Sequence, residues 1–283
     1  MTTTIPRACV MGYPVAHSRS PMIHGYWLDE LGIRGAYDLQ ELTPEAFPAF
    51  LTHLGEHGYV GGNITVPHKQ TAFRLVDARD AAAEAIGAVN TVWREGGTLF
   101  GGNSDAHGFI ANLDACAPGW DVPGGRAVIL GAGGAARAAA YALVARGLTV
   151  VLVNRTEAHE VGLAAAFAGG VVAGGGFESL ARLLPSADLL VNCTSLGMVG
   201  KPRLPIDLAP LKHEAVVYDI VYVPLETELL AAARRQGNRT ADGLGMLLHQ
   251  AGFGFGKWFG AHPRITPALR AMVEADIVAK TAR

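Results

Sequence analysis

Residues 127–137 read AVILGAGGAAR, and this stretch decides the fold. The apolar run before Gly131 is typical of a buried strand, and the alanine-rich run after the glycines favours a helix. The spacing is the GxGxxA form of the dinucleotide-binding fingerprint. In that pattern Gly131 allows a tight turn, Gly133 lets backbone N–H groups approach a pyrophosphate, and Ala136 permits close packing of helix on strand.

The surroundings of this loop make the interpretation specific. An ordinary glycine-rich turn is the alternative, but a helix is predicted at 135–146 and a second strand at 149–153. Strand, loop, helix and second strand together form the βαβ unit that the fingerprint requires. We therefore expect a nucleotide site formed by Gly131, Ala132, Gly133, Gly134 and Ala135.

The end of the second predicted strand indicates which dinucleotide binds. Enzymes that use NAD usually carry an acidic residue here for the ribose 2′-hydroxyl, whereas this chain has Asn154, Arg155 and Thr156. A guanidinium group pairs with the 2′-phosphate of NADP, which a carboxylate would repel. A solvated arginine at a strand end is the alternative, but the missing acid favours NADP(H) as the cofactor.

The rest of the chain alternates short β-rich runs with alanine- and leucine-rich helical runs, which is typical of parallel α/β architecture. Strands are predicted at 8–11, 36–39, 62–66, 91–93, 127–130, 149–153, 188–191 and 216–220. Helices are predicted at 21–31, 44–55, 81–86, 106–115, 135–146, 157–167, 226–236, 244–259 and 267–278. We expect an α/β protein of two domains: an N-terminal domain with a mainly parallel sheet, and a Rossmann-type doubly wound dinucleotide-binding domain.

The expected boundaries place the first domain at 1–104, the nucleotide domain at 105–241, and two terminal helices in 242–283. Terminal helices that follow a nucleotide domain often pack back on the first domain, which would make that domain discontinuous.

Composition excludes several classes of protein. Half of the 283 residues are hydrophobic, which is enough for two cores, and the net charge of −2 comes without a basic stripe for nucleic acid. No apolar stretch reaches the roughly 18 residues that cross a bilayer, and the start lacks the pattern of a signal peptide. The three cysteines show no metal-ligand spacing, and the histidines show none either. We expect a cytoplasmic protein without a metal.

Several polar residues of the first domain lie at predicted strand ends, where α/β sheets place ligands. Ser18 and Ser20, in a loop expected to be extended, offer two hydroxyls to a carboxylate, although Ser20 before Pro21 also suits a helix N-cap. Lys69 suits a proton donor or a solvated side chain. Asp105 suits a site or an N-cap.

Seven motifs together resemble the shikimate dehydrogenase family, and the match covers essentially the whole chain. They are GYPVAHSRSP at 12–21, GNITVPHK at 62–69, GAVNT at 87–91, GAGGAAR at 131–137, NRT at 154–156, NCTSLGM at 192–198 and DGLGMLLHQA at 242–251.

The resemblance implies reversible, NADPH-dependent reduction of 3-dehydroshikimate to shikimate, a step of chorismate and aromatic amino-acid biosynthesis. It implies a substrate domain built from both chain ends, with Lys69 and Asp105 as the catalytic pair. It implies that Ser18 and Ser20 hold the substrate carboxylate, with further contacts from Asn63, Thr65, Asn90, Tyr222 and Gln250. Thr194 and Gly243 would lie near the nicotinamide.

Three positions depart from the family pattern: Gly102 replaces an acid, Ala106 replaces a glycine, and His68 replaces a phenylalanine beside the lysine. Two other functions remain open. One is a catabolic quinate or shikimate dehydrogenase that uses NAD, which the acid-free stretch at 154–156 disfavours. The other is a non-catalytic NADP(H) sensor, which the retention of Lys69 and Asp105 disfavours. We expect small-molecule ligands only, and a monomer or a homodimer.

Overall fold

The computed structural model describes residues 5–156, 162–164, 167 and 169–281. The chain forms two compact units, Met1–Ser104 with Leu248–Val273, and Asp105–Leu247 with Glu274–Arg283. These units divide the chain after Ser104, after Leu247 and after Val273, and residues 274–283 group with the second unit. The domain boundaries at 104 and 241 stay predictions.

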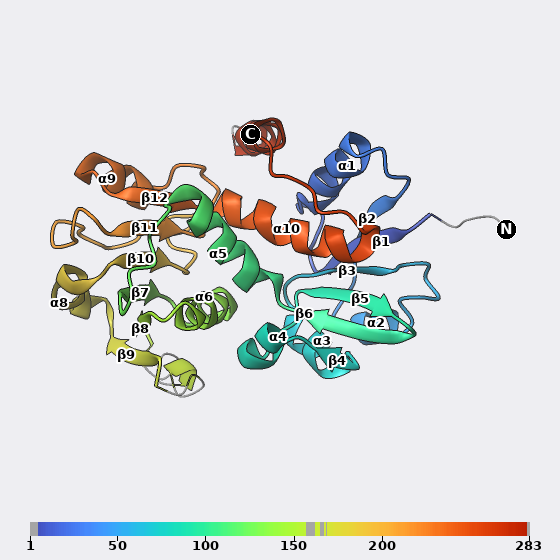
Figure 1. Cartoon of the computed structure of the whole chain (residues 1–283), viewed down its shortest axis with the longest axis horizontal. Coiled ribbons are helices and arrows are strands. Elements are labelled where there is room, and N and C mark those ends of the chain that lie inside the picture. The colour runs from blue at the N-terminus through green and yellow to red at the C-terminus, as the bar shows by residue number, and fades with distance from the viewer. Residues whose placement is uncertain (1–4, 157–161, 165–166, 168, 282–283) are drawn as a thin grey trace. The chain divides into compact units, whose positions relative to one another are not determined.

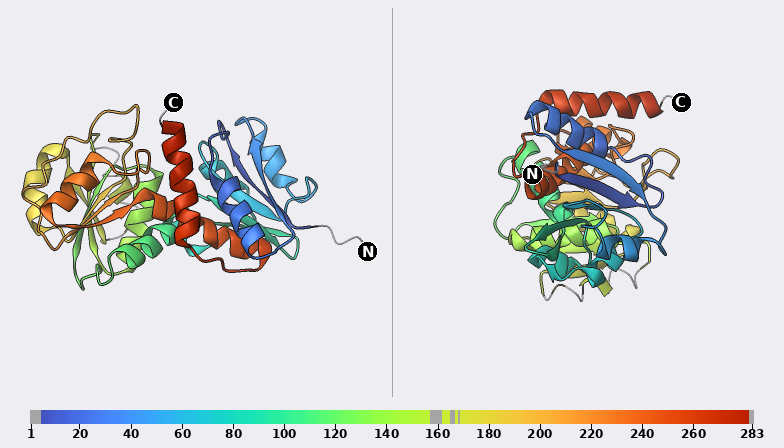
Figure 2. Two further views of the ribbon diagram at one scale, coloured as in Figure 1. Left: turned by 90° about the horizontal axis from the view of Figure 1, so that it is seen from above. Right: turned by 90° about the vertical axis from the view of Figure 1, so that its right-hand side faces the viewer.

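A six-stranded mixed sheet forms the centre of the first unit, in the order β2-β1-β3-β5-β6-β4 (Figures 1 and 2). Its strands are β1 (Arg7–Gly12), β2 (Ala36–Glu41), β3 (Gly61–Ile64), β4 (Ala78–Arg79), β5 (Thr91–Glu95) and β6 (Thr98–Gly102). β1 pairs in parallel with β2 and β3, and β4 with β6, whereas β5 is antiparallel to both of its neighbours. Most of the strand pairs are therefore parallel, as expected.

The helices of the first unit lie between its strands or after them along the chain. They are α1 (Ser20–Glu30), α2 (Phe47–Thr52), α3 (Lys69–Leu75), α4 (Ala81–Ile86), and the parts of α10 (Gly243–Phe259) and α11 (Pro267–Thr281) that belong to this unit. The helix expected at 44–55 is shorter, because its flanks form turns. α3, β4 and β6 were not predicted.

The second unit is built on a six-stranded sheet that is parallel throughout, in the order β12-β11-β10-β7-β8-β9 (Figure 1). Its strands are β7 (Arg126–Leu130), β8 (Thr149–Val153), β9 (Val171–Gly175), β10 (Leu189–Asn192), β11 (Val216–Asp219) and β12 (Arg239–Asp242). The chain reverses its direction of progress across the sheet between β7 and β10. Open α/β sheets bind ligands at this switch point, outside the carboxyl ends of the strands.

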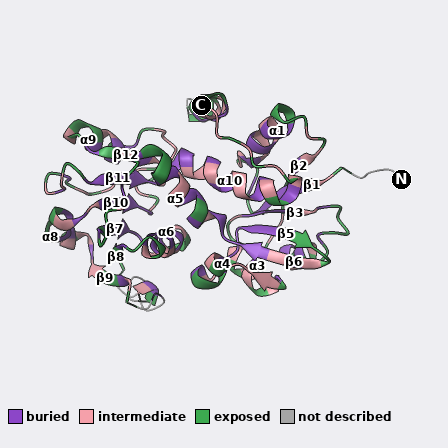
Figure 3. Cartoon of the chain, viewed as in Figure 1, coloured by how far each residue is buried: buried purple, intermediate pink, exposed green. Residues whose placement is uncertain are grey.

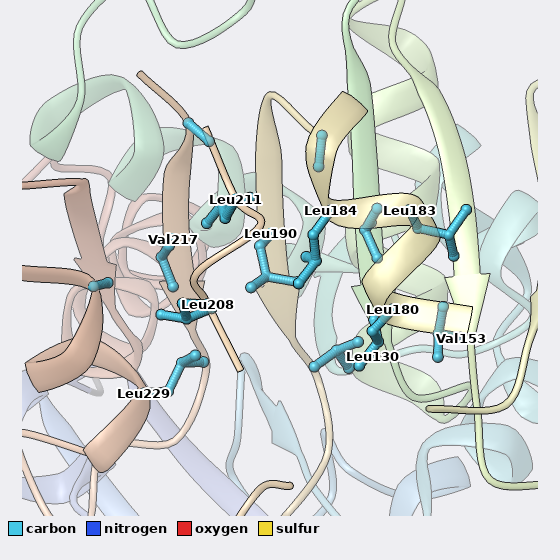
Figure 4. Packing of buried hydrophobic residues seen from close by; sticks show 14 of the residues in the cluster. Leu130, Val153, Leu180, Leu183, Leu184, Leu190, Leu208, Leu211, Val217 and Leu229 are labelled. Carbon is cyan, nitrogen blue, oxygen red and sulfur yellow. The ribbon is translucent and has the colours of Figure 1, made fainter. Parts of the chain in front are cut away.

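Helices cover this sheet and bury its strands, which Figure 3 shows in the colour of buried residues. They are α5 (Ser104–Cys116), α6 (Gly134–Ala145), α8 (Leu180–Leu183) and α9 (Glu228–Gln236), with short 3₁₀ turns at Phe177–Ser179 and Leu184–Ser186. Leu130, Leu184, Leu190, Val217 and Leu229 belong to one of the unit's buried clusters (Figure 4). Of the helix expected at 157–167, residues 162–164 are helical, and 157–161 and 165–166 lie outside the described residues.

In the part of the chain that the structure describes, no helix combines the length and the apolar character needed to cross a membrane.

Candidate active site

The glycine loop follows β7 at the switch point of the second sheet. Gly131 has φ +106°, a left-handed conformation that favours glycine, and its N–H donates to Val153 O at 2.8 Å. A Cβ atom at Gly131 would lie 3.2 Å from Cys193 O, on the neighbouring strand end. The backbone angle and the close approach to Cys193 O therefore both require a glycine at position 131, where the fingerprint begins.

The N-terminus of α6 opens directly behind this loop. Gly133 is its N-cap residue, and no side chain at this position supplies a capping hydrogen bond. Gly133 and Gly134 are exposed, and a Cβ atom at either would meet no described atom within 4 Å. The first-turn N–H groups of a helix need acceptors, and this end is open to one from outside the chain. The site therefore fits the pyrophosphate of a dinucleotide.

The residues after β8 form a tight turn at the same edge of the sheet. Asn154 Nδ2 donates to Thr156 O at 2.9 Å, which closes a tight turn. Arg155 between them is exposed, and its guanidinium group makes no hydrogen bond or ion pair with any described residue. The turn from Asn154 to Thr156 contains no carboxylate, which favours the pairing of Arg155 with a phosphate group.

The residues after β10 form a rigid turn beside the glycine loop. Asn192 Oδ1 accepts hydrogen bonds from Thr194 N at 3.0 Å and from Thr194 Oγ1 at 2.7 Å, and Thr194 Oγ1 accepts one from Leu196 N at 3.0 Å. Asn192 Nδ2 donates to Asp219 Oδ1 on β11 at 2.9 Å. Burial raises the pKa of Asp219, although its hydrogen bonds oppose this shift.

Two further predicted residues follow β11 and β12, at the same edge of the sheet. Tyr222 is half-buried three residues after β11 ends. A Cβ atom at Gly243, the first residue of α10, would lie 2.0 Å from Ile220 O, so only glycine fits there. The carboxyl ends of adjacent strands thus bring all of the predicted residues of this unit, apart from Asp105, to one edge of the sheet.

In the first unit, the loop after β1 carries Ser18 and Ser20 in a tight turn. Ser18 N donates to Val15 O at 2.9 Å, Ser20 N donates to Ser18 Oγ at 3.3 Å, and Arg19 has helical angles. The expectation of an extended loop is therefore wrong, because a turn held by its own hydrogen bonds competes with it. Ser20 is not the N-cap either: α1 begins at Ser20 and Arg19 holds the N-cap position.

A buried polar network lies where β3 pairs with β5 in the first unit. Tyr37 OH donates to Asn63 Oδ1 at 2.7 Å, and Asn63 Nδ2 donates to Thr91 Oγ1 at 3.2 Å. Ser104 N donates to Asn90 Oδ1 at 2.7 Å, and Ser104 Oγ lies 3.1 Å from Gln250 Oε1. The network therefore joins three predicted residues, Asn63, Asn90 and Gln250, to three that were not predicted, Tyr37, Thr91 and Ser104.

Lys69 and Asp105 each lie in the first turn of a helix. Lys69 is the first residue of α3, half-buried, and its carbonyl accepts a hydrogen bond from Val89 N at 3.0 Å. Asp105 is the second residue of α5, half-buried, and directly follows Ser104. Asp105 therefore lies inside the helix rather than at its N-cap.

Comparison with known proteins identifies the family to which a chain with these features belongs. Residues 10–92 match the family described as shikimate dehydrogenase substrate binding domain, and residues 119–210 match shikimate / quinate 5-dehydrogenase. A shikimate dehydrogenase (NADP(+)) of Rhodopseudomonas palustris strain BisB18 is 53% identical over 276 residues, 97% of this chain and 99% of that protein. The chain belongs to the shikimate dehydrogenase family.

Solved structures of similar proteins agree with this membership. A shikimate 5-dehydrogenase from Thermus thermophilus, in complex with NADP(H) and shikimate, is 36% identical over 96% of this chain and 100% of its own, with a TM-score of 0.84. A quinate dehydrogenase from Corynebacterium glutamicum, in complex with NAD, is 29% identical over 96% of this chain and 99% of its own, with a TM-score of 0.88. The fold class expected from the sequence is confirmed.

Within the shikimate dehydrogenase family, the structure explains two departures of this chain. His68 stacks on Phe47 with ring centroids 4.2 Å apart, as a phenylalanine would, and its Nε2 also donates to Leu42 O at 2.7 Å. A Cβ atom at Gly102 would lie 2.4 Å from Asp80 Oδ2. The aromatic packing beside Lys69 is thus retained, and Asp80 occupies the space next to Gly102.

Proposed function

We propose that this chain is an NADP-dependent shikimate dehydrogenase, which reduces 3-dehydroshikimate to shikimate reversibly in the pathway to chorismate and the aromatic amino acids. The observation that carries the proposal is 53% identity, over nearly the whole chain, to a relative named for that activity. The open N-terminus of α6 and the acid-free turn around the exposed Arg155 support the choice of cofactor.

The cofactor site is proposed at the carboxyl edge of the second sheet. The pyrophosphate binds the loop from Gly131 to Ala135 and the N–H groups of α6. Arg155, with Asn154 and Thr156, pairs with the 2′-phosphate. Thr194 and Gly243 contact the nicotinamide end. When bound, NADPH supplies the hydride that reduces the carbonyl carbon.

The protein's own residues manage the substrate and its proton. Ser18 and Ser20 hold the carboxylate, and Thr65, Asn90, Tyr222 and Gln250 bind the hydroxyls and help to orient the ring. Lys69 stabilises the negative charge that develops on the carbonyl oxygen and donates a proton to it. Asp105 orients Lys69 and accepts a hydrogen bond from the same hydroxyl.

For Asn63 we propose a role other than the one that the resemblance implies. Its Oδ1 accepts from Tyr37, and its Nδ2 donates to Thr91 Oγ1 at 3.2 Å and to Asn90 O at 3.4 Å. Both amide hydrogens are therefore engaged inside the first unit. We propose that Asn63 supports the site through these hydrogen bonds rather than by binding substrate.

The test is the rate of reduction of NADP⁺ and of NAD⁺, each with shikimate and with quinate. We expect the combination of NADP⁺ and shikimate to give the highest kcat/KM. A protein that oxidises quinate with NAD⁺ as efficiently as shikimate with NADP⁺ would instead be the catabolic enzyme. No oxidation in any of the four combinations would favour an NADP(H)-sensing protein.

We also propose that the protein works in the cytoplasm, as a monomer or a homodimer with small-molecule ligands only. The support is that none of Cys9, Cys116 and Cys193 forms a disulfide, which suits a reducing compartment. Light scattering of the purified protein measures the oligomeric state.

A further inference from the structure

Arg137 is the fourth residue of α6, one turn after the N-cap residue Gly133. We propose that Arg137 is a further cofactor-binding residue, whose guanidinium group pairs with the pyrophosphate of NADP(H) beside the open N-terminus of the helix. This inference rests on the proposed function, because it adds a residue to the cofactor site proposed there. The residues that carry it all belong to the second unit.

The guanidinium group of Arg137 has no acceptor within the described part of the chain. The residue is half-buried, yet its side chain makes no hydrogen bond, ion pair or ring contact with any described residue. A guanidinium group always carries its charge and several N–H donors, and partial burial deprives these donors of water. An acceptor from outside the chain would therefore stabilise Arg137, and an anion would do so most strongly.

The helix directs this side chain towards the glycine loop. Side chains of an α-helix lean towards its N-terminus, and residues four apart lie on the same side of it. Arg137 follows Gly133 by four residues, whereas Ala136 and Ala138 on either side of Arg137 are buried in the core. A Cβ atom at Gly133 or Gly134 would meet no described atom within 4 Å. Neither glycine therefore blocks the direction in which Arg137 leans.

The position of Arg137 is unfavourable for a helix without a ligand. The N-terminus of a helix carries a partial positive charge, so acidic side chains stabilise this end and cations destabilise it. The first turn of α6 has no acidic residue, and Arg137 N donates to Gly133 O at 3.0 Å. The N–H groups that precede Arg137 have no acceptor within the helix. A cation at this place is favourable once an anion is bound, because the helix and the guanidinium group then attract the same charge.

The pyrophosphate is the anion that fits this place. NADP(H) also carries a 2′-phosphate, but the residues proposed for that group follow β8, whereas Arg137 belongs to the helix that follows β7. The pyrophosphate of a dinucleotide binds at the N-terminus of that helix. Because NADP and NAD share the pyrophosphate, Arg137 contributes to the binding of both cofactors, and Arg155 discriminates between them.

The experiment compares Arg137→Gln with the wild type by the Kd for NADP⁺, for NAD⁺ and for adenosine 2′-monophosphate, each measured by calorimetry. The third compound carries the 2′-phosphate and no pyrophosphate. Loss of a charged hydrogen bond corresponds to an increase of about tenfold or more in the Kd of both dinucleotides. The Kd for adenosine 2′-monophosphate should stay within about twofold.

Arg155→Gln is the matched variant, and it should give a different pattern. It should weaken NADP⁺ and adenosine 2′-monophosphate, and leave the Kd for NAD⁺ within about twofold. If Arg137→Gln gives this same pattern, the proposal is overturned, because Arg137 would then contact the 2′-phosphate.

Urea unfolding of the cofactor-free protein separates binding from a structural role. Because Arg137 opposes the helix dipole, the urea midpoint of Arg137→Gln should be equal to that of the wild type or higher. A midpoint well below that of the wild type would contradict the proposal, since Arg137 would then stabilise the fold itself.

The proposed function and this inference fail in different ways. A wild-type protein that binds neither NADP⁺ nor NAD⁺ overturns the proposed cofactor, and this inference with it. A wild-type protein that binds NADP⁺, together with an Arg137→Gln variant of equal affinity for both dinucleotides, overturns the inference alone.

Discussion

At the scale of single residues, His24 stands out among the buried polar groups. Its side chain is completely buried, and neither ring nitrogen has a hydrogen-bond partner among the described residues. The ring stacks on Tyr37 with centroids 4.0 Å apart and packs near Phe255 and Trp258. Burial lowers the pKa of His24 from 6.5 to about 3, so the folded protein keeps this ring neutral across the physiological range.

The low pKa of His24 makes the stability of the fold depend on pH. Below pH 6.5 the unfolded chain binds a proton at His24 that the folded chain does not, so the free energy of unfolding falls as the pH falls. The loss is about 1.4 kcal/mol per pH unit until the pH nears the folded pKa. Between about pH 7.5 and about pH 5, the wild type should therefore lose about 2 kcal/mol more than His24→Phe.

Urea unfolding of both proteins at the two pH values measures this difference, and His24→Leu serves as a second variant. The remaining histidines are the same in all three proteins, so their effect cancels in the comparison. Parallel loss of stability in wild type and variants would show that His24 is protonated inside the fold.

Lys69 carries the proposed proton transfer. Lys69→Ala should lower kcat by about 10²-fold or more, because a positioned acid–base group contributes a factor of that order, and KM for shikimate should change much less. Lys257→Ala is the matched control: it removes the other lysine of the first unit, which lies over the ring of Trp93 at 4.4 Å. A Lys69→Ala variant with only a raised KM would show that Lys69 binds substrate without transferring a proton.

Arg155 carries the choice between cofactors. Arg155→Gln should raise the Kd for NADP⁺ by about tenfold or more, since a charged hydrogen bond is lost, and leave the Kd for NAD⁺ within about twofold. Fluorescence titration with each cofactor measures the two constants. Arg235→Gln, at an exposed arginine of α9, should change neither constant. Equal weakening of both cofactors by Arg155→Gln would contradict the assignment.

At the scale of elements, Asp80 ties a helix to the strand end that leads into the site. Its Oδ1 accepts from Ala83 N at 2.6 Å and caps α4, and its Oδ2 accepts from Asn103 N at 3.3 Å, just after β6. The space beside Oδ2 is free only because residue 102 is glycine. One carboxylate therefore caps α4 and holds Asn103, which joins β6 to α5.

Gly102→Asp should lower the free energy of unfolding by about 2 kcal/mol or more, because its Cβ would overlap Asp80 Oδ2 and add a second negative charge there. Urea unfolding measures the loss. Adding Asp80→Ser to that variant keeps a short N-cap side chain and vacates the space, so it should recover part of the stability. If the double variant is less stable than Gly102→Asp alone, the overlap with Asp80 is not the cause.

The elements also show what a sequence can reveal. The helix at 81–86 and the strand at 149–153 were predicted with their observed bounds, because one has a cap and a terminal glycine and the other is an unbroken β-branched run. β9 contains glycines and β12 is polar; both are edge strands, formed by pairing rather than by propensity. α3 is short and begins directly after Pro67-His68, without a capping side chain.

The candidate site likewise contains residues that the sequence predicts and residues that it does not predict. Lys69, Asn90 and Asp105 follow recognisable motifs, so their positions near element ends were predictable. Tyr37 and Ser104 carry no local signal, and Thr91, although it ends the motif at 87–91, was not predicted as a site residue. They enter the network only because the pairing of β3 with β5 sets Asn63 opposite Thr91, and because the chain returns with Gln250. The register of paired strands, and the packing of a late segment of the chain against an early one, are properties of the tertiary structure that local patterns do not encode.

At the scale of the whole molecule, the first unit depends on residues from both ends of the sequence. Trp258 on α10 is 5% exposed, and its Nε1 donates to Val92 O on β5 at 2.8 Å. A Cβ atom at Gly61 on β3 would lie 2.3 Å from the same nitrogen. The indole therefore packs closely against two strands that precede it by more than 160 residues in the chain.

Trp258→Ala should destabilise the first unit by about 3–5 kcal/mol, the usual cost of removing a large buried ring. Hydrogen exchange should then accelerate for amides of β1, β3 and β5, and much less for those of β7, β8 and β10. Trp120→Ala, at a tryptophan of the second unit that is 2% exposed, is the matched control and should give the opposite pattern. Equal acceleration in both units after either substitution would mean that they unfold as one.

The return of residues 248–273 to the first unit determines the order in which a ribosome can complete this protein. Residues 1–104 emerge first, yet they lack both Gln250 and Trp258 until 154 further residues, 105–258, have been made. At the usual rates of synthesis that delay is on the order of 10 s. The second unit, made from one nearly continuous stretch, can close during this time. The first 104 residues thus wait for a segment that is made much later, and their sheet is exposed to chaperones in the interval.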